Sequence, residues 1–306
     1  MPPPDSGPCY IRFRMRKNAG IRQTERTHPL SKGSDALPVR DFLRLMHAGS
    51  RAAFDAVGSA LPGMEKVVRA ATSAIRAGGR VYYAGAGTSG RLGAIDAAEV
   101  GPTFGSDAFK AVIAGGPPAM LKAAEGAEDD RDEGRRLAGQ VKKRDLAIGI
   151  SASGKTPFVA AFLEEASRRG APAWLICSNR VRYGFLAGTV LLPTGPELIA
   201  GSTRLNAATA QKLCLNLIST AVMVQLGGAY DGHMVGVVPA NRKLVERAKR
   251  IIAACTGCSL EEAGGYLDSS GMNVKVAILM RAKGVTRRRA QKLLKENGGR
   301  LRGLID

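Results

Sequence analysis

The chain has 306 residues, 45% of them hydrophobic, and its 45 Lys and Arg against 26 Asp and Glu give a formal charge of +19. This composition allows one sizeable buried core, and no uninterrupted apolar run approaches the roughly 18 to 20 residues that a membrane helix needs. The N-terminus also lacks the hydrophobic region of a signal peptide, so we expect a soluble cytoplasmic protein without a membrane partner.

The positive charge gathers near the two ends of the chain, in "YIRFRMRKNAGIRQTERTH" and "RAKGVTRRRAQKLLKENGGRLRG". Clustered Lys and Arg bind phosphate backbones, so a nucleic-acid partner has to be considered. Few aromatic residues are interleaved there to stack on bases, which favours a solvated basic surface instead. The five cysteines suit a reducing compartment, and we expect no disulfide.

The first part of the chain predicts an extension followed by helices. Residues 1–22 contain Pro and Gly clusters without an apolar period, so we expect a disordered basic extension. In residues 23–78 the apolar side chains recur at helical spacing, which predicts an N-terminal segment of two or three helices. The stretch 77–79, "AGG", is typical of a helix C-cap.

Strands and helices alternate in residues 79–250. The short apolar runs are "RVYYAG", "FKAVIAGG", "DLAIGIS", "PAWLICS" and "GTVLLPTG", and the expected helices lie near residues 90–99, 117–140, 157–170 and 205–226. This alternation predicts an α/β fold with a doubly wound parallel sheet, in which ligands bind beyond the carboxyl ends of the strands. Residues 251–306 are basic and helical, and we expect a small C-terminal three-helix subdomain.

A dinucleotide-binding loop is one interpretation of the first glycine-rich turn. Gly85, Gly87 and Gly90 have the G-x-G-x-x-G spacing after a strand and before a helix. That fingerprint also requires an acidic residue at the end of the next strand to hold the ribose, and here the strand ends in "AGG". The sequence therefore argues against a nicotinamide or flavin cofactor.

A nucleotide P-loop is a second interpretation, because "GISASGKT", residues 149–156, satisfies G-x-x-x-x-G-K-[ST] in full. A P-loop enzyme also needs an acidic residue at the end of another strand to help hold magnesium, and the other runs end in "AGG", "CSN" and "PTG". This loop alone leaves ATP open.

Cys255 and Cys258 form a C-x-x-C pair, which could indicate a zinc site. A structural zinc site requires a second pair of ligands, and the three histidines are scattered along the chain. We expect no metal.

Both glycine-rich loops share abundant hydroxyl groups at the start of a helix. Helix N-terminal amides with Ser and Thr hydroxyls can hold a phosphate without magnesium, as a sugar phosphate requires. A third segment, "GSTRLNAATAQK", precedes another expected helix. Ordinary helix capping would explain any one of these segments, but three in one sheet favour a sugar-phosphate site.

Several longer stretches carry a family resemblance: "GAGTSGRLGAIDAAEVGPTFG", "AEGAEDD", "GISASGKTPF", "GPELIAGSTRL" and "TAQKLCLNLIST". In this order they resemble the signatures of N-acetylmuramic acid 6-phosphate etherases, which belong to the sugar isomerase (SIS) superfamily. The resemblance runs from about Thr24 to the C-terminus. It implies cofactor-free cleavage of the D-lactyl ether of a phosphorylated amino sugar, in a homodimer with its sites near the subunit interface.

The resemblance also assigns residues. Glu99 matches the family's acid, which protonates the departing ether oxygen, and Glu128 matches the base that removes the proton from carbon 2. The substrate-binding residues that it implies are Gly87, Thr88, Ser89, Ser153, Gly154, Thr156, Ser202 and Arg204. Arg204 would meet the phosphate or the lactyl carboxylate, or form a structural ion pair. We expect Glu99 on the protein-facing side of its helix, because it has helical spacing from Leu92 and Ile95.

Some positions depart from the family pattern. Asn206 stands where the family has Lys and Ala208 where it has Gly, while Lys155 keeps the charge of the usual Arg. Further departures are Gly101, Gly232 and Gly236. Losing a charged partner costs about 1.5 to 3 kcal/mol in binding. This keeps open a sugar-phosphate sensor without activity, although a sensor has no need of the pair Glu99 and Glu128.

Overall fold

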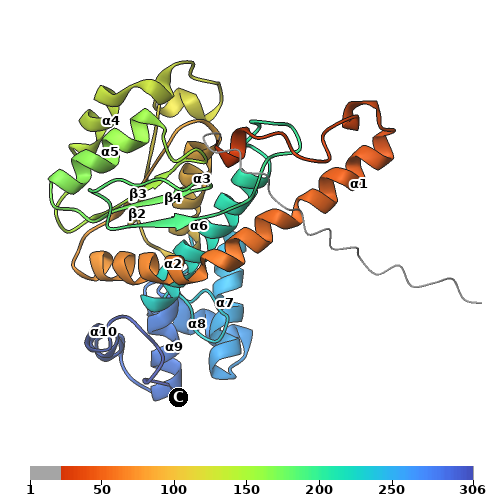
Figure 1. Cartoon of the computed structure of the whole chain (residues 1–306). Helices are drawn as coiled ribbons and strands as arrows, with labels where there is room; N and C mark the ends of the chain where they lie inside the picture. Colours follow the sequence, from red (N-terminus) through yellow and green to blue (C-terminus); the bar gives the residue numbers. More distant parts are fainter. Residues whose placement is uncertain (1–21, 306) are drawn as a thin grey trace, which may run out of the picture.

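The computed structural model of the protein describes residues 22–305 (Figure 1). The predicted disordered extension, residues 1–22, therefore lies outside the described residues except for Arg22.

Five parallel strands form one sheet in the order β2-β1-β3-β4-β5. Their bounds are β1 Val81–Gly85, β2 Phe109–Ile113, β3 Leu146–Ile150, β4 Ala173–Cys177 and β5 Gly188–Leu191. Each strand falls in one of the five predicted apolar runs. Gly85 at the end of β1 pairs with Ile113 on one side and Ile150 on the other, so the strands end level and their carboxyl ends share one edge.

Helices cover both faces of the sheet (Figure 1). The helices α2 Arg51–Arg76, α3 Gly87–Phe104 and α6 Asn206–Gln225 share one apolar core with the sheet, and α4 Arg131–Ala138 and α5 Pro157–Arg168 share the other. Side chains alternate between the cores, with Tyr83 and Ile148 in the first and Tyr82 and Ala147 in the second. Burial on both faces explains the continuous apolar strands and confirms the predicted α/β class.

Helix α6 is, by length and composition alone, the one helix among residues 22–305 that could cross a membrane. Of its apolar stretch of 18 residues, 56% is buried inside the protein. Packing against α2, α3 and the sheet accounts for its apolar sequence.

The expected helix over residues 117–140 is wrong. The structure has two 3-10 turns, η3 Pro117–Met120 and η4 Ala127–Asp129, followed by the short helix α4. Two consecutive prolines remove backbone donors, and Gly126 adopts a left-handed φ of 72°, so the segment cannot continue as one helix. The result is a loop that carries Glu128 at the sheet edge.

The N-terminal segment contains two 3-10 turns, η1 Gln23–Glu25 and η2 Ser34–Ala36, and two helices, α1 Val39–Gly49 and α2. Helix α1 has no buried residue and projects from the body of the protein (Figure 1). The predicted C-cap of α2 is confirmed: Gly78 has a φ of 74°, and its amide donates to the Ile75 carbonyl while that of Gly79 donates to Ala74.

The C-terminal helices enclose a core of their own, below the sheet in Figure 1. They are α7 Arg242–Thr256, α8 Leu260–Ser269, α9 Val274–Lys283 and α10 Arg287–Glu296. The predicted boundary between residues 250 and 251 falls inside α7, and the three helices α8–α10 follow it. Val235 and Val237, from the loop before α7, belong to the same core.

Asp96 is an acidic residue on the buried face of α3. Its side chain is 5% exposed, and one carboxyl oxygen accepts a hydrogen bond from the Ser219 hydroxyl of α6 at 3.1 Å. The other oxygen is buried without a hydrogen-bond partner among the described residues. Burial raises the pKa of Asp96, and the Ser219 hydroxyl, the Tyr83 hydroxyl and the charge of Lys212 oppose this shift only partly.

This burial predicts a pH-dependent stability. The folded protein binds the Asp96 proton more tightly than the unfolded chain, whose carboxyl has the ordinary pKa of 3.8. The contribution of Asp96 to stability is therefore fully present below that value and is lost as pH rises through the raised pKa of the folded state. Asp96→Asn removes the titration, so its free energy of unfolding should fall less over this range than that of the wild type. Urea unfolding at stepped pH measures the difference, and equal slopes would contradict the assignment.

Candidate functional site

The first loop places a helix directly at the end of β1. A Cβ added to Gly90 would lie 2.7 Å from the Gly85 carbonyl oxygen, so only glycine permits this approach. Helix α3 consequently begins at Gly87, and Thr88 and Ser89 lie in its first turn. No side chain caps this helix, so its first amide groups are left without a side-chain acceptor. They lie at the carboxyl end of β1, where an anion can bind them.

The second loop, residues 151–156, is organised by a hydroxyl that the sequence analysis did not select. Ser151 is 3% exposed, and its Oγ accepts the Gly154 amide at 3.0 Å. The same oxygen lies 2.8 Å from the Thr156 hydroxyl and 3.3 Å from the Ser153 hydroxyl. Gly154 has a φ of 72°, which only glycine adopts readily. Ser151 thus fixes the loop, and Ser153 and Thr156 are half-exposed at its surface.

The third loop differs because its helix start is already occupied. Glu197 is fully buried, and its carboxylate accepts the amides of Asn206 and Ala207 at 2.9 Å each. Burial raises the pKa of Glu197, while these two hydrogen bonds lower it. The N-terminus of α6 is therefore not open to a phosphate.

Arg204 and Ser202 lie beside this third loop. Arg204 is exposed and lines a cavity of about 340 Å³ together with His28 and Leu205, and no ion pair holds it within residues 22–305. Ser202 is half-buried. Asn206 donates from its side-chain amide to the Gly49 carbonyl at 3.2 Å, so the residue in the Lys position ties α6 to α1.

The segment before α1 crosses the sheet edge. Asn179, which follows β4, donates through Nδ2 both to the Thr24 hydroxyl at 3.1 Å and to the Ala152 carbonyl at 2.9 Å. The Thr24 carbonyl accepts the Gly201 amide at 3.2 Å. Thr24 thereby joins the second and third loops.

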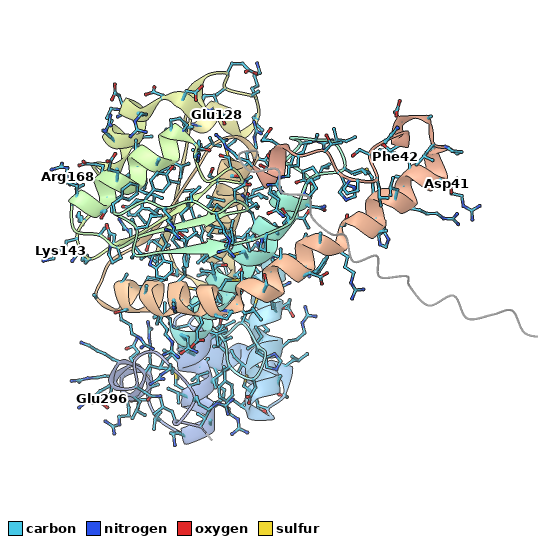
Figure 2. All side chains as sticks on the ribbon, viewed as in Figure 1. Asp41, Phe42, Glu128, Lys143, Arg168 and Glu296 are labelled. Atoms are coloured by element: carbon cyan, nitrogen blue, oxygen red, sulfur yellow. The ribbon has the colours of Figure 1, made fainter. Side chains whose placement is uncertain are left out.

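Glu128 lies beside the first loop. It is exposed in the turn before α4, where Figure 2 labels it. It lines a cavity of about 160 Å³ with Gly87 and Arg91. Arg91 donates to the carbonyls of Ala119 at 2.9 Å and Lys122 at 3.0 Å. This side chain therefore holds the loop that carries Glu128 against α3, a role that the sequence did not reveal.

The expectation that Glu99 faces the protein is wrong. The buried residues of α3 are Gly90, Gly93, Asp96 and Val100, whereas Glu99 is exposed and Ile95 is 45% exposed. Glu99 is also twelve residues after Gly87, about 18 Å along the helix axis at 1.5 Å per residue. A single chain does not bring Glu99 and Glu128 together.

Residues 22–305 contain no cluster of three His, Cys, Asp or Glu side chains that could hold a metal ion. Cys255 and Cys258 are free thiols, and burial raises the pKa of Cys255 to about 11.

Known proteins match this chain over most of its length. The profile of the glucokinase regulatory protein N-terminal SIS domain matches residues 63–167. An N-acetylmuramic acid 6-phosphate etherase from Cutibacterium acnes is 45% identical over 294 residues, which cover 94% of this chain and 96% of that protein. The chain belongs to the N-acetylmuramic acid 6-phosphate etherase family.

Other etherases of the family are similarly related. The Geobacillus thermodenitrificans enzyme is 46% identical over 263 residues, which cover 84% of this chain and 89% of that protein. Among solved structures, a phosphoheptose isomerase from Neisseria gonorrhoeae is 16% identical, with a TM-score of 0.44 over 60% of this chain and 98% of that one.

Ser151→Ala should destabilise the protein by about 0.5 to 1.5 kcal/mol, because it removes the Oγ that the Gly154 amide and the Thr156 hydroxyl share, while the Ser151 carbonyl still accepts that amide at 3.1 Å. Ser153→Ala is the matched control in the same loop: Ser153 bonds the exposed Lys155 amide, which water can satisfy, so we expect a smaller loss. Urea unfolding of both variants measures the difference, and equal stabilities would show that Ser151 does not organise the loop.

Proposed function

We propose that the protein is a carbon–oxygen lyase that cleaves the D-lactyl ether of N-acetylmuramic acid 6-phosphate, giving N-acetylglucosamine 6-phosphate and D-lactate for amino-sugar recycling. The observation that carries this proposal is the match to etherases over nearly the full length of both chains. The same relatives give no support to a sensor without activity. A reducing compartment suits the four free thiols of the described chain, so we propose that it acts in the cytoplasm.

The first two loops would hold the phosphate of the substrate. Their helix starts lack side-chain caps, and the hydroxyls of Ser89, Ser153 and Thr156 lie beside those amides. A phosphate accepts hydrogen bonds only, and both the amides and the hydroxyls can supply donors. Arg204, which has no ion pair among the described residues, is available for the lactyl carboxylate.

The chemistry needs two proton-transferring groups. In the opened sugar the aldehyde acidifies carbon 2, and Glu128 takes its proton. The electron pair forms a double bond between carbons 2 and 3, the bond from carbon 3 to the ether oxygen breaks, and Glu99 protonates the departing lactate. Glu99 then removes a proton from water, whose hydroxyl adds to carbon 3, while Glu128 returns its proton to carbon 2. The net reaction consumes one water.

The positions of the two carboxylates support a homodimer. Glu99 is exposed about 18 Å along α3 from the phosphate loop, so the Glu128 of its own chain is out of reach. Apolar side chains are exposed on α1 and α2, namely Val39, Leu43, Phe54 and Leu61, and α1 buries none of its residues in its own chain. We propose that a second copy covers these helices and that Glu99 of one copy completes the site around Glu128 of the other.

The wild type should release D-lactate from N-acetylmuramic acid 6-phosphate in the presence of EDTA. Glu99→Gln and Glu128→Gln should each lower kcat by about a hundredfold or more, because each removes one proton transfer. Enzymatic detection of D-lactate measures the rates, with Glu125→Gln, a neighbouring exposed carboxylate, as the control that keeps activity. Binding of the sugar phosphate without lactate release would reject the etherase.

A heterodimer of the two inactive variants tests the shared site. Co-expression of Glu99→Gln and Glu128→Gln chains with different affinity tags allows the mixed dimer to be isolated. One of its sites then holds both carboxylates, and about half of the wild-type activity should return. If both carboxylates came from one chain, the mixed dimer would be inactive.

A further inference from the structure

A buried amide contacts the first phosphate loop, and the proposed reaction does not use it. Gln211 of α6 is 1% exposed, and its Oε1 lies 2.9 Å from the Ser89 hydroxyl of α3. This hydrogen bond joins residues 122 positions apart in the sequence. The Nε2 of the same side chain is buried and has no hydrogen-bond partner among the described residues.

With Oε1 of Gln211 placed toward Ser89, this bond conflicts with phosphate binding at Ser89. A serine hydroxyl has one hydrogen to donate, and Gln211 Oε1 accepts it here. The phosphate oxygens of a sugar phosphate are acceptors as well, so they need the same hydrogen. While Ser89 donates to Gln211, it has no donor left for the ligand.

Rotation of the amide group by half a turn frees the Ser89 hydrogen, and it moves Oε1 to the buried place where Nε2 now has no partner among the described residues. The oxygen and nitrogen of a carboxamide are nearly equal in size, so Nε2 can take the place of Oε1 without repacking. In that orientation Nε2 finds its missing acceptor in the Ser89 oxygen, and the Ser89 hydrogen becomes free. Hydrogen bonds arranged in such a chain strengthen one another.

We propose that Gln211 is a positioning residue whose amide rotates when a phosphorylated ligand binds, so that Nε2 donates to Ser89 and Ser89 donates to the phosphate. This inference rests on the proposed function in placing the phosphate at Ser89. The proposal adds that α6 contributes to substrate binding through the buried side chain of Gln211, which contacts Ser89.

A double-mutant cycle tests the coupling. Gln211→Met keeps the volume of the side chain and removes both polar atoms, and it should raise KM for N-acetylmuramic acid 6-phosphate about tenfold. The phosphate is remote from the reacting carbons, so kcat should stay near the wild-type value. When Ser89→Ala is already present, Gln211→Met should cause no further rise. Gln225→Met, at the exposed end of the same helix, is the matched control and should leave KM unchanged.

An unchanged KM, or the same increase with and without Ser89, would overturn the proposal, since a merely structural glutamine would act independently of Ser89. If Gln211→Met does not fold, Gln211→Asn shortens the amide by one methylene and should show the same coupling. If the wild type binds N-acetylglucosamine 6-phosphate but releases no lactate, the etherase fails, and the cycle is then run on the Kd of that ligand by calorimetry. Coupling there would support the role of Gln211, and its absence would reject it.

Discussion

The site depends on the contact between the backbones of Gly85 and Gly90. No Cβ fits at either position, because it would lie 2.7 Å from the other residue's backbone. The contact lets α3 start where β1 ends, so that the first amides of the helix and the Ser89 hydroxyl meet the sheet edge. Gly93 continues the close approach, since a Cβ there would lie 2.9 Å from Ile150. With α3 held in this orientation by its glycines, Asp96 is buried and Glu99 is exposed to solvent.

The three loops at the sheet edge differ in whether the first amides of their helices are free or already bonded to a side chain. Two helices begin without a side-chain cap, and their amides can receive a phosphate. The third begins against the buried carboxylate of Glu197, which satisfies its amides from inside the protein. The chain thus fills one helix start with its own carboxyl group and leaves two helix starts for a ligand. The buried carboxyl at the third loop distinguishes it from the other two, a difference that its hydroxyl-rich sequence does not reveal.

Much of the fold follows from the sequence, because buried parallel strands are short apolar runs and glycines mark the turns after them. The errors have physical causes. Helical spacing suggested that Ile95 faces inward, but the small residues Gly90 and Gly93 are what mark the buried stripe of α3. Ser151 and Gln211 were not selected as functional residues for another reason: both are distinguished by burial, and Gln211 also by a partner that is remote in sequence.

The hydrogen bonds of Thr24 have a consequence for how the protein is made. Its partners, Asn179 and Gly201, are synthesised more than 150 residues later, Asn179 after four of the five strands and Gly201 after all five. Thr24 therefore cannot form these hydrogen bonds until the loops that contain Asn179 and Gly201 have been synthesised. Contacts of such sequence separation form late because closing the chain costs entropy first. The contacts of Thr24 at the carboxyl edge of the sheet thus depend on residues from the later part of the chain.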